Sequence, residues 1–347
     1  MRAAVFDGPG RIVVVDRPDP VVAEPTDAVV RVTATCVCGS DLWYYRGQSP
    51  REHGQTIGHE FVGVVEEVGA AVRHLRPGTQ VVAPFRWNDG DCPHCTRGAP
   101  VACRRGGIWG QPGADGGQGE AVRVPFADAT LVPVPDGAAP PELLPSLLAL
   151  SDVMGTGHHA AVTAGVRPGS TVAVVGDGAV GLCGVLAARR LGAERVVACS
   201  RHPGRQALAR RVGATDVVAG RGDEAVAELL DLTDGVGVDH VLECVGTGES
   251  MRTALAAVRP YGGVGYVGLP HGVELPVGTL FGRGLTVGGG IAPARRYLPE
   301  LLADVLDGTI EPGVVFDHRV GLEQIADGYR AMDERRSVKT LCLVEHT

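Results

Sequence analysis

A glycine-rich turn in the middle of the chain constrains the fold more than any other feature of the sequence. It joins an apolar segment at Thr171–Val175, predicted as a strand, to a predicted helix that runs to about Leu191. In order, the residues of the turn are Gly176, Asp177, Gly178, Ala179, Val180 and Gly181. The first glycine permits a tight turn, the second lets backbone approach a pyrophosphate, and the third lets helix and strand pack closely. The helix N-terminus then faces the phosphates, so the segment predicts a dinucleotide-binding unit.

The residues that follow the second strand of this unit indicate which dinucleotide is bound. An NAD-binding protein places Asp or Glu there, about twenty residues after the glycines, to bond the ribose 2′-hydroxyl. This chain has Ser200 and Arg201 at that position and Arg205 shortly afterwards, with no carboxylate among them. Two arginines suit a 2′-phosphate, and we therefore predict NADP rather than NAD. In the alternative interpretation, Arg201 and Arg205 are only the solvated start of the next helix.

The spacing of apolar segments divides the chain into two kinds of structure. Up to about residue 135, short β-rich runs alternate with Gly and Pro, which is typical of a small barrel-like domain. The strands predicted there are Arg11–Val15, Asp27–Ala34, Gly63–Val68, Thr79–Pro84 and Ala121–Pro125. From Leu143, helical stretches alternate with apolar strands in the βαβ rhythm of a parallel sheet. The strands predicted there are Thr171–Val175, Arg195–Cys199, Asp216–Val218, His240–Glu243 and Gly263–Gly268.

The last segment of the chain leaves the βαβ rhythm. It holds two predicted helices, Tyr297–Asp307 and Leu322–Arg335, and a closing strand at Thr340–Val344. We therefore predict an α/β protein in which residues 152–291 form a doubly wound parallel-sheet domain. This domain is inserted between residues 1–151 and residues 292–347 of a β-rich domain. The length of 347 residues allows two such domains, each with its own core.

Charge and hydropathy narrow the class of partner. The formal net charge is −8 and the chain has no basic block, which argues against nucleic acid and against a polybasic membrane patch. The most apolar window, residues 171–188, contains Asp177 and is closed by Arg189 and Arg190, so it is not predicted to cross a membrane. No apolar stretch follows Met1, and we expect a cytosolic protein that binds a small molecule.

The nine cysteines are unevenly placed along the chain. Five fall in the first third: Cys36, Cys38, Cys92, Cys95 and Cys103. In a cytosolic chain of this size, clustered cysteines are more often metal ligands than disulfides. The other four lie in apolar strand or helix patterns and are predicted core residues: Cys183, Cys199, Cys244 and Cys342. Cys36, two residues before Cys38, is assigned to packing.

Two short motifs offer candidate zinc ligands. Cys38 follows an apolar strand, with Ser40 and Asp41 close behind it, and the pair His59-Glu60 begins another strand. A thiolate and an imidazole from separate loops, with carboxylates nearby, suit zinc. Taken singly, Cys38 also fits a core position and His59 also fits a loop histidine held by hydrogen bonds.

The sequence around His59 favours the metal interpretation. Gly58-His59-Glu60, followed by Gly63, Gly69 and Val72, resembles the signature of zinc-containing medium-chain alcohol dehydrogenases. Within this family the pattern is nearest to bacterial NADP-dependent secondary alcohol dehydrogenases. The resemblance covers essentially the whole chain, and it implies a GroES-like catalytic domain, a Rossmann insert and a C-terminal return to the catalytic domain.

The resemblance implies a catalytic zinc held by Cys38, His59 and Asp152. Most relatives have Cys in place of Asp152, and the branch with Asp uses NADP, which agrees with the coenzyme prediction above. Glu60 matches a residue that can take the fourth position when substrate is absent.

The resemblance also implies a second, structural zinc. Many relatives hold it with four cysteines, and the matching residues here are Asp89, Cys92, Cys95 and Cys103. A carboxylate oxygen binds zinc as well, so an Asp and three Cys are chemically possible. The alternative is a metal-free lobe with three reduced thiols.

The function implied by the resemblance is hydride transfer between NADP(H) and an alcohol/carbonyl pair, with zinc activating the substrate oxygen. Ser40 matches a hydroxyl that receives the substrate proton. Trp43 stands where many relatives have a relay His; because its indole cannot accept a proton, we assign it to the substrate pocket. Trp109 matches an aromatic pocket wall, with core packing as an equal alternative.

Further expectations come from the same resemblance. Thr156 should contact the nicotinamide, and Lys339, the only lysine of the chain, should contact the coenzyme pyrophosphate. We expect a homo-oligomer, either a dimer or a tetramer. Two other functions remain open. One is a dehydrogenase or reductase that acts on a polyol, an aldehyde or a biosynthetic intermediate with NAD(H). The other is a redox-inactive sensor that binds zinc and nucleotide.

Overall fold

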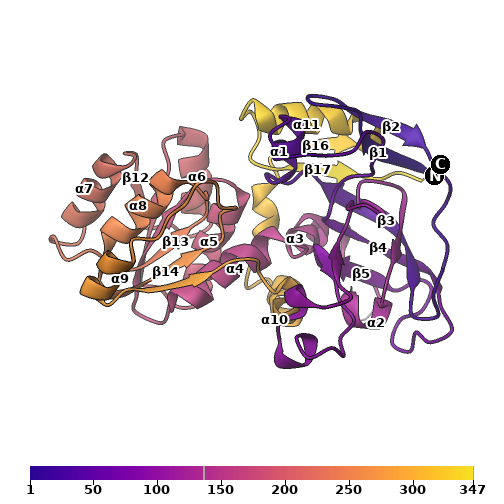
Figure 1. Cartoon of the computed structure of the whole chain (residues 1–347), viewed down its shortest axis with the longest axis horizontal. Coiled ribbons are helices and arrows are strands. Elements are labelled where there is room, and N and C mark those ends of the chain that lie inside the picture. Colours follow the sequence, from indigo (N-terminus) through magenta and orange to yellow (C-terminus); the bar gives the residue numbers. More distant parts are fainter. Residues whose placement is uncertain (136, 347) are drawn as a thin grey trace. The chain divides into compact units, whose positions relative to one another are not determined.

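The computed structural model describes residues 1–135 and 137–346, which divide into two compact units (Figure 1). The first unit consists of Met1–Asp152 and Pro293–Thr347, and the second consists of Val153–Ala292. Each boundary lies one residue beyond the predicted one.

Asp152 groups with the first unit because the residue before it is bonded to that unit. The N–H of Phe85 donates to the carbonyl of Ser151 at 2.9 Å. The hydroxyl of Ser151 donates in turn to the carbonyl of Phe61 at 3.1 Å. These bonds fix the position of Asp152 relative to the strands of the first unit.

Both ends of the sequence contribute strands to the main sheet of the first unit. Its strands are β3 (Ala28–Cys36), β4 (Phe61–Val68), β5 (Gln80–Ala83), β8 (Ala121–Val124), β9 (Val132–Pro133), β16 (His318–Gly321) and β17 (Thr340–Leu343). They follow the order β16-β17-β3-β4-β5-β9, and β8 also pairs with β3. Strand β17 runs antiparallel to β3, with Cys342 opposite Thr35. The segment after the inserted unit therefore completes the sheet that was begun before it.

The first unit also contains smaller elements. Two strand pairs are β1 (Arg2–Phe6) with β2 (Ile12–Asp16), and β6 (Arg86–Trp87) with β7 (Gly107–Ile108). The α-helices are α1 (Asp41–Tyr45), α2 (Ala127–Thr130), α3 (Leu144–Ala149), α10 (Ala294–Leu306) and α11 (Ile325–Asp333). The 3-10 helices are η1 (Cys95–Arg97), η2 (Pro100–Ala102), η3 (Pro141–Leu143), η4 (Pro312–Val315) and η5 (Leu322–Gln324).

Aromatic side chains fill part of the core of the first unit. Phe61 is fully buried and lies edge-on to Trp109, with ring centroids 5.2 Å apart. Trp109 also contacts Trp87, and its indole N–H donates to the carbonyl of Pro84 at 2.8 Å. These contacts make Trp109 a core residue, which supports the packing interpretation of this tryptophan.

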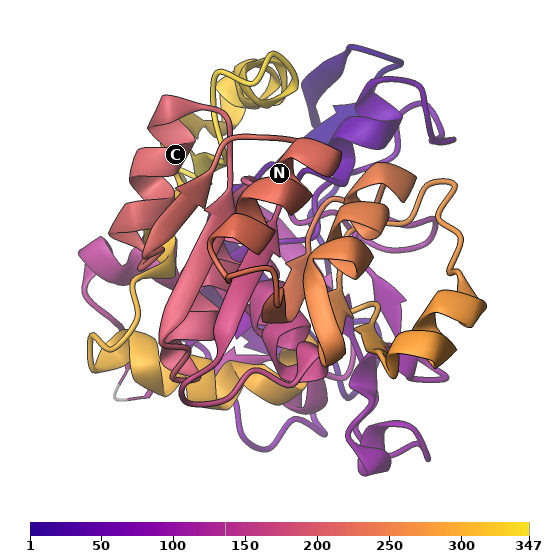
Figure 2. The ribbon, with the colours of Figure 1, turned by 90° about the vertical axis from the view of Figure 1, so that its left-hand side faces the viewer.

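The second unit consists of one parallel sheet and the helices that connect its strands (Figure 2). Its strands are β10 (Thr171–Val175), β11 (Arg195–Cys199), β12 (Asp216–Val218), β13 (Val238–Glu243), β14 (Val258–Tyr266) and β15 (Thr286–Gly289). The helices are α4 (Val153–Ala164), α5 (Ala179–Arg190), α6 (Pro203–Arg211), α7 (Asp223–Asp231), α8 (Gly248–Ala257) and α9 (Val277–Arg283). Across the described residues the strand order is β12-β11-β10-β13-β14-β15, and every neighbouring pair is parallel. The order reverses at β10, which is where doubly wound sheets bind their ligands.

The sequence predicted the first three strands of this sheet with the bounds that the structure has. The predicted start of β14 at Gly263 is wrong, because the strand begins five residues earlier at Val258. Its first half contains Pro260 and the exposed Tyr261 in a left-handed conformation, with φ of 57°. The pairing with β13 shifts register there, so this half lacks the regular apolar pattern of a strand.

Several bounds in the first unit also differ from the prediction. Strand β3 continues two residues beyond Ala34, and β4 starts at Phe61 rather than Gly63. The helix predicted at Leu322–Arg335 is a 3-10 turn followed by α11, which ends at Asp333. Arg335 has a φ of 58°, a conformation that an α-helix does not allow.

Candidate metal and coenzyme sites

Four potential metal ligands meet in the first unit. Cys38 follows β3, His59 and Glu60 precede β4, and Asp152 follows α3. One ligand atom from each lies within 4.8 Å of all the others. The Sγ of Cys38 is 3.7 Å from Oδ2 of Asp152, and Nε2 of His59 is 3.5 Å from the same oxygen. The structure therefore brings together every residue that the sequence assigned to the catalytic metal.

Asp41 orients the imidazole of His59 in this cluster. Its Oδ1 lies 3.3 Å from Nδ1 of His59, which leaves Nε2 directed at the other donors. Its second oxygen accepts the backbone N–H of Cys38 at 3.0 Å. Burial lowers the pKa of His59, but Asp41 and Cys38 together raise it well above its usual range. A carboxylate behind a ligand histidine is the usual way in which proteins fix the ring of a metal ligand.

Glu60 and Lys339 form a buried ion pair beside the cluster. Nζ of Lys339 lies 2.7 Å from Oε1 of Glu60 and 3.3 Å from the carbonyl of Val37. Oε2 of Glu60 is also buried, and it has no hydrogen-bond partner among the described residues. One oxygen of Glu60 is therefore satisfied by Lys339, whereas the other is open to a cation. The predicted contact between Lys339 and the coenzyme pyrophosphate stays a prediction.

The donor set fits zinc in both chemistry and spacing. Zinc binds Cys sulfur, His nitrogen and carboxylate oxygen at about 2.0–2.3 Å in a tetrahedral arrangement. Such a tetrahedron has edges of about 3.3–3.8 Å. The measured separations of 3.5 Å and 3.7 Å fall in this range. Glu60 offers the fourth donor through Oε2, which has no hydrogen-bond partner among the described residues. Its carboxylate lies beside the cluster, with Oε1 4.0 Å from Nε2 of His59.

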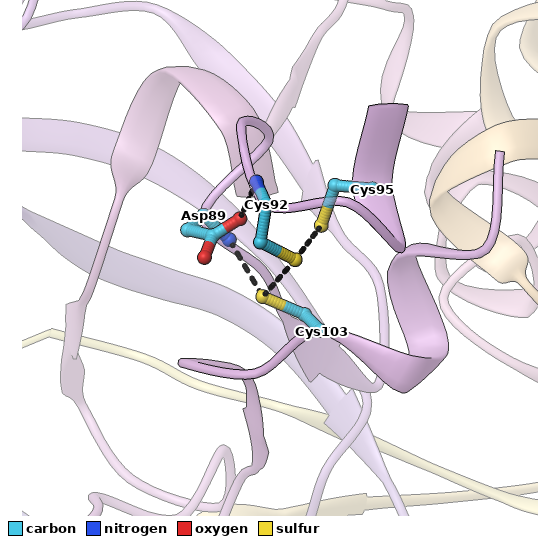
Figure 3. A group of neighbouring side chains, drawn as sticks. All are labelled: Asp89, Cys92, Cys95 and Cys103. Atoms are coloured by element: carbon cyan, nitrogen blue, oxygen red, sulfur yellow. Dashed lines mark hydrogen bonds between the residues drawn. The ribbon is translucent and has the colours of Figure 1, made fainter. Parts of the chain in front are cut away.

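A second cluster lies between β6 and β7, and it consists of Asp89, Cys92, Cys95 and Cys103 (Figure 3). Figure 3 shows the three sulfur atoms pointing toward one another, with the carboxylate of Asp89 beside them. The Sγ of Cys92 is 3.6 Å from that of Cys95 and 3.9 Å from that of Cys103. These separations suit the tetrahedral site that the sequence predicted, with Asp89 in the fourth position.

The carboxylate of Asp89 is held in place by its neighbours. Oδ1 accepts the backbone N–H groups of Asp91 at 3.1 Å and Cys92 at 3.0 Å. Oδ2 accepts Nε of Arg105 at 2.9 Å. Burial raises the pKa of Asp89, but the N–H of Cys92 and the guanidinium of Arg105 lower it well below its usual range. A carboxylate offers about four acceptor positions, so these three bonds leave one for a metal.

The glycine turn of the second unit has the geometry of a dinucleotide site. Gly176 has a φ of 120°, which favours glycine. A Cβ on Gly181 would lie 1.9 Å from the carbonyl oxygen of Gly176, so helix α5 approaches the turn too closely for any side chain. A Cβ on Gly178 would meet nothing within 4 Å, which leaves space above the N-terminus of α5. The tight turn at Gly176 and the close packing at Gly181 are as predicted, whereas the approach of a pyrophosphate at Gly178 stays a prediction.

The structure corrects one premise of the coenzyme prediction. The end of β11 is not free of carboxylates, because Asp177 of the glycine turn reaches it. Oδ2 of Asp177 accepts the hydroxyl of Ser200 at 2.8 Å, and Oδ1 lies 3.1 Å from Nη1 of Arg205. The residues directly after the second strand include no carboxylate, and this one comes from the neighbouring loop.

The remaining predicted site residues lie in both units. Ser40 is exposed at the start of α1, and Trp43 is half-buried on the same helix. Thr156 is buried on α4, and Arg201 is exposed after β11. Helices long and apolar enough for a membrane span are absent from the two described segments, 1–135 and 137–346.

Two protein-family models match the chain. The family model of the alcohol dehydrogenase GroES-like domain matches residues 24–136, and that of the zinc-binding dehydrogenase matches residues 179–307. The chain is 38% identical to a probable zinc-binding alcohol dehydrogenase of Mycobacterium tuberculosis, over 95% of this chain and 84% of that protein. The chain belongs to the zinc-containing medium-chain dehydrogenase family.

Solved structures of this dehydrogenase family have the same fold. Alcohol dehydrogenase TADH from Thermus sp. ATN1 is 34% identical, with a TM-score of 0.91 over 99% of this chain and 100% of that chain. A zinc-binding dehydrogenase of Sinorhizobium meliloti bound to NADP is 28% identical, with a TM-score of 0.83 over 99% and 98% of the two chains. The predicted GroES-like and Rossmann architecture is confirmed, and this medium-chain dehydrogenase is an oxidoreductase.

Sequence reasoning missed three contacts of this dehydrogenase. They are the support of His59 by Asp41, the pairing of Lys339 with Glu60, and the contact of Asp177 with Arg205. The contact of Asp41 with His59 had a signal in the sequence: Asp41 follows Cys38 by three residues, as in a short turn, which places it near the predicted ligands. For the pairing of Lys339 with Glu60, the only signal was that Lys339 is the single lysine of an Arg-rich chain.

Proposed function

We propose that the chain is an alcohol dehydrogenase or carbonyl reductase that transfers hydride between NADP(H) and an alcohol/carbonyl pair. The observation that carries this proposal is the convergence of Cys38, His59 and Asp152 on one point of the first unit. Three such ligands leave one position of a tetrahedral zinc open, as in catalytic rather than structural sites. Bound zinc supplies Lewis acidity toward the substrate oxygen, and the nicotinamide accepts or donates the hydride.

The chain's own residues hold this site in a reactive form. Asp41 keeps Nε2 of His59 directed at the cluster, and Lys339 compensates the charge of the buried Glu60. The net negative charge of the ligands is thereby limited to Cys38 and Asp152, so a bound cation keeps much of its electrophilicity.

Ser40 is the proposed acceptor of the substrate proton. The Oγ of Ser40 can accept the substrate proton only if the hydroxyl proton of Ser40 passes to another acceptor. Because Ser40 is exposed, solvent can be that acceptor. Trp43, on the same helix, cannot serve as the next carrier because its indole nitrogen only donates. We therefore propose that the proton leaves Ser40 directly to solvent, and that Trp43 limits the shape of the substrate.

The preference for NADP(H) rests on the end of β11. Ser200, Arg201 and Arg205 provide a hydroxyl and two guanidinium groups there. The structural relative from Sinorhizobium meliloti, which is bound to NADP, supports the same choice. The homo-oligomer and the cytosolic location stay predictions.

The test is a screen of ketones and aldehydes with NADPH and NADH, combined with metal analysis of the purified protein. We expect zinc near two per chain, turnover of at least one carbonyl, and a higher kcat/KM with NADPH. Asp152→Ala should remove one zinc and abolish turnover, whereas Asp16→Ala, at an exposed position of β2, should change neither. Normal turnover by Asp152→Ala would refute the ligand assignment. Zinc and nucleotide binding without turnover of any carbonyl would support the sensor instead.

A further inference from the structure

We infer that Asp177, within the glycine turn, is the residue that sets the ratio between NADP(H) and NAD(H). The inference rests on the proposed function, because it assumes that the second unit binds the coenzyme. It adds that the chain accepts both coenzymes, with the preference for NADP(H) limited by one carboxylate that the turn places against Ser200 and Arg205.

The position of Asp177 follows from the sheet. Val175 at the end of β10 pairs with Cys199 at the end of β11, so the residues that follow both strands share one edge. Asp177 lies two residues beyond the first strand, and Ser200 lies one residue beyond the second. NAD-binding proteins have a carboxylate after the second strand for the ribose 2′-hydroxyl. Here the neighbouring loop supplies a carboxylate to the same place.

The contacts of Asp177 link it to the groups that suit a 2′-phosphate. Its two oxygens hold the hydroxyl of Ser200 at 2.8 Å and Nη1 of Arg205 at 3.1 Å. The Arg205 side chain is 17% exposed and that of Asp177 is 21% exposed, so the pair is partly shielded from solvent. Nη1 of Arg205 also lies 3.4 Å from the carbonyl of Asp177. Arg205 is thus already committed to the turn before any coenzyme binds.

These contacts affect the two coenzymes in opposite ways. A 2′-phosphate is an anion. To bind, it must replace Asp177 as the partner of Arg205 and Ser200, and it then still lies close to the carboxylate of Asp177. Like charges a few ångströms apart near a protein surface repel strongly enough to change affinity by about tenfold or more. A 2′-hydroxyl instead donates a hydrogen bond to Asp177 and leaves the ion pair intact. Arg201 is exposed at the same edge, and its positive charge still favours binding of the 2′-phosphate.

The ion pair also has a purely structural interpretation, in which it only ties α6 to the glycine turn. The two interpretations differ in what they predict for selectivity. A structural tie would weaken both coenzymes equally when it is broken, whereas a selector would change the ratio of their affinities. The ratio is therefore the decisive quantity.

The experiment measures dissociation constants of NADPH and NADH by fluorescence titration of the zinc-loaded protein, for the wild type and two variants. Asp177→Asn keeps the size of the side chain and removes its charge; we expect NADPH to bind about tenfold tighter and NADH to bind less tightly. Arg205→Gln should weaken NADPH about tenfold and leave NADH within twofold. Asp231→Asn, an equal charge change at an exposed position of α7, should leave the ratio unchanged.

The outcomes separate this inference from the proposed function. A shift of the NADPH to NADH ratio in opposite directions in the two variants supports the inference. A ratio that stays within twofold of the wild type in Asp177→Asn overturns it, whatever Arg205→Gln does and even if the enzyme turns over carbonyls normally. Binding of both coenzymes without turnover contradicts the proposed function and still allows the ratio to be tested. If Asp177→Asn fails to fold, Asp177→Ser, which also removes the charge, is measured in its place.

Discussion

Nζ of Lys339 lies 2.7 Å from Oε1 of Glu60, and neither side chain exposes more than 1% of its surface. The two residues are 279 positions apart, one before β4 and the other before β17. This ion pair therefore links the start of β4 to the start of β17, the last strand of the described residues. It also places the only lysine of the chain beside the proposed zinc ligands.

Removing Lys339 should destabilise the protein strongly. Lys339→Met would leave the charge of Glu60 buried without compensation, and breaking such a pair typically costs about 3–5 kcal/mol. The double variant Lys339→Met with Glu60→Gln should recover most of this loss, because it leaves no buried charge. Urea unfolding of the wild type and the two variants measures the effect. Equal stability of all three would show that the pair contributes nothing.

The role of Asp89 as a metal ligand can be tested by counting zinc. Asp89→Ala should lower the zinc content by one per chain and expose the segment between β6 and β7 to proteases. Asp89→Cys should keep the zinc, because a fourth thiolate binds it at least as well. Metal analysis by mass spectrometry and limited proteolysis provide the readouts. Full zinc content in Asp89→Ala would exclude the carboxylate as a ligand.

Two glycines of the coenzyme turn should respond differently to alanine. In Gly181→Ala, the new methyl group would lie 1.9 Å from a backbone oxygen that cannot move aside, so we expect a loss of about 1–3 kcal/mol in stability. In Gly178→Ala, nothing lies within 4 Å, so stability should be unchanged. The methyl group would instead obstruct the pyrophosphate and weaken NADPH binding. Thermal melting with and without NADPH distinguishes the two; similar melting of both variants without coenzyme would contradict this account.

His158 should make the folded protein sensitive to mild acid. Burial, with smaller effects of Arg190 and His159, lowers the pKa of His158 to about 4. In the unfolded chain a histidine has a pKa of about 6.5, so between these values the unfolded state binds more protons. Stability is therefore fully present above pH 6.5 and falls as the pH decreases toward 4, by up to about 3 kcal/mol.

The comparison with His158→Gln isolates this contribution. Glutamine does not titrate, so the wild type should lose more unfolding free energy than the variant between pH 6.5 and pH 4.5. Urea unfolding at several pH values measures the difference, and loss of zinc in acid affects both proteins equally. Parallel pH profiles would show that His158 does not titrate abnormally.

Local patterns predicted the parts of this protein that depend on local sequence. Strands β10 to β12 are short apolar runs between turns, and their bounds could be predicted directly. The ligands Cys38 and His59 were found through motifs of three or four residues and a family resemblance. Strand β14 was predicted too short because Pro260 and Tyr261 interrupt its apolar pattern, while pairing with β13 still holds it in the sheet.

The contacts that sequence reasoning missed are between distant residues. No spacing rule relates Lys339 to Glu60, because only the closure of the sheet by β17 brings them together. Asp177 was recognised in the sequence as part of the glycine motif. Its contact with Arg205 could not be predicted, because it depends on the relative positions of two loops. Trp109 had two equal interpretations until its contacts with Phe61 and Pro84 assigned it to the core.

The burial of Lys339 has a practical consequence for chemical labelling. Because the chain has no other lysine, the folded protein offers amine-directed crosslinkers, dyes and acylating reagents no accessible side chain. Reaction at this position requires that the sheet formed by β17 and β3 separate. The rate of its modification is thus a direct reporter of opening at the centre of the first unit.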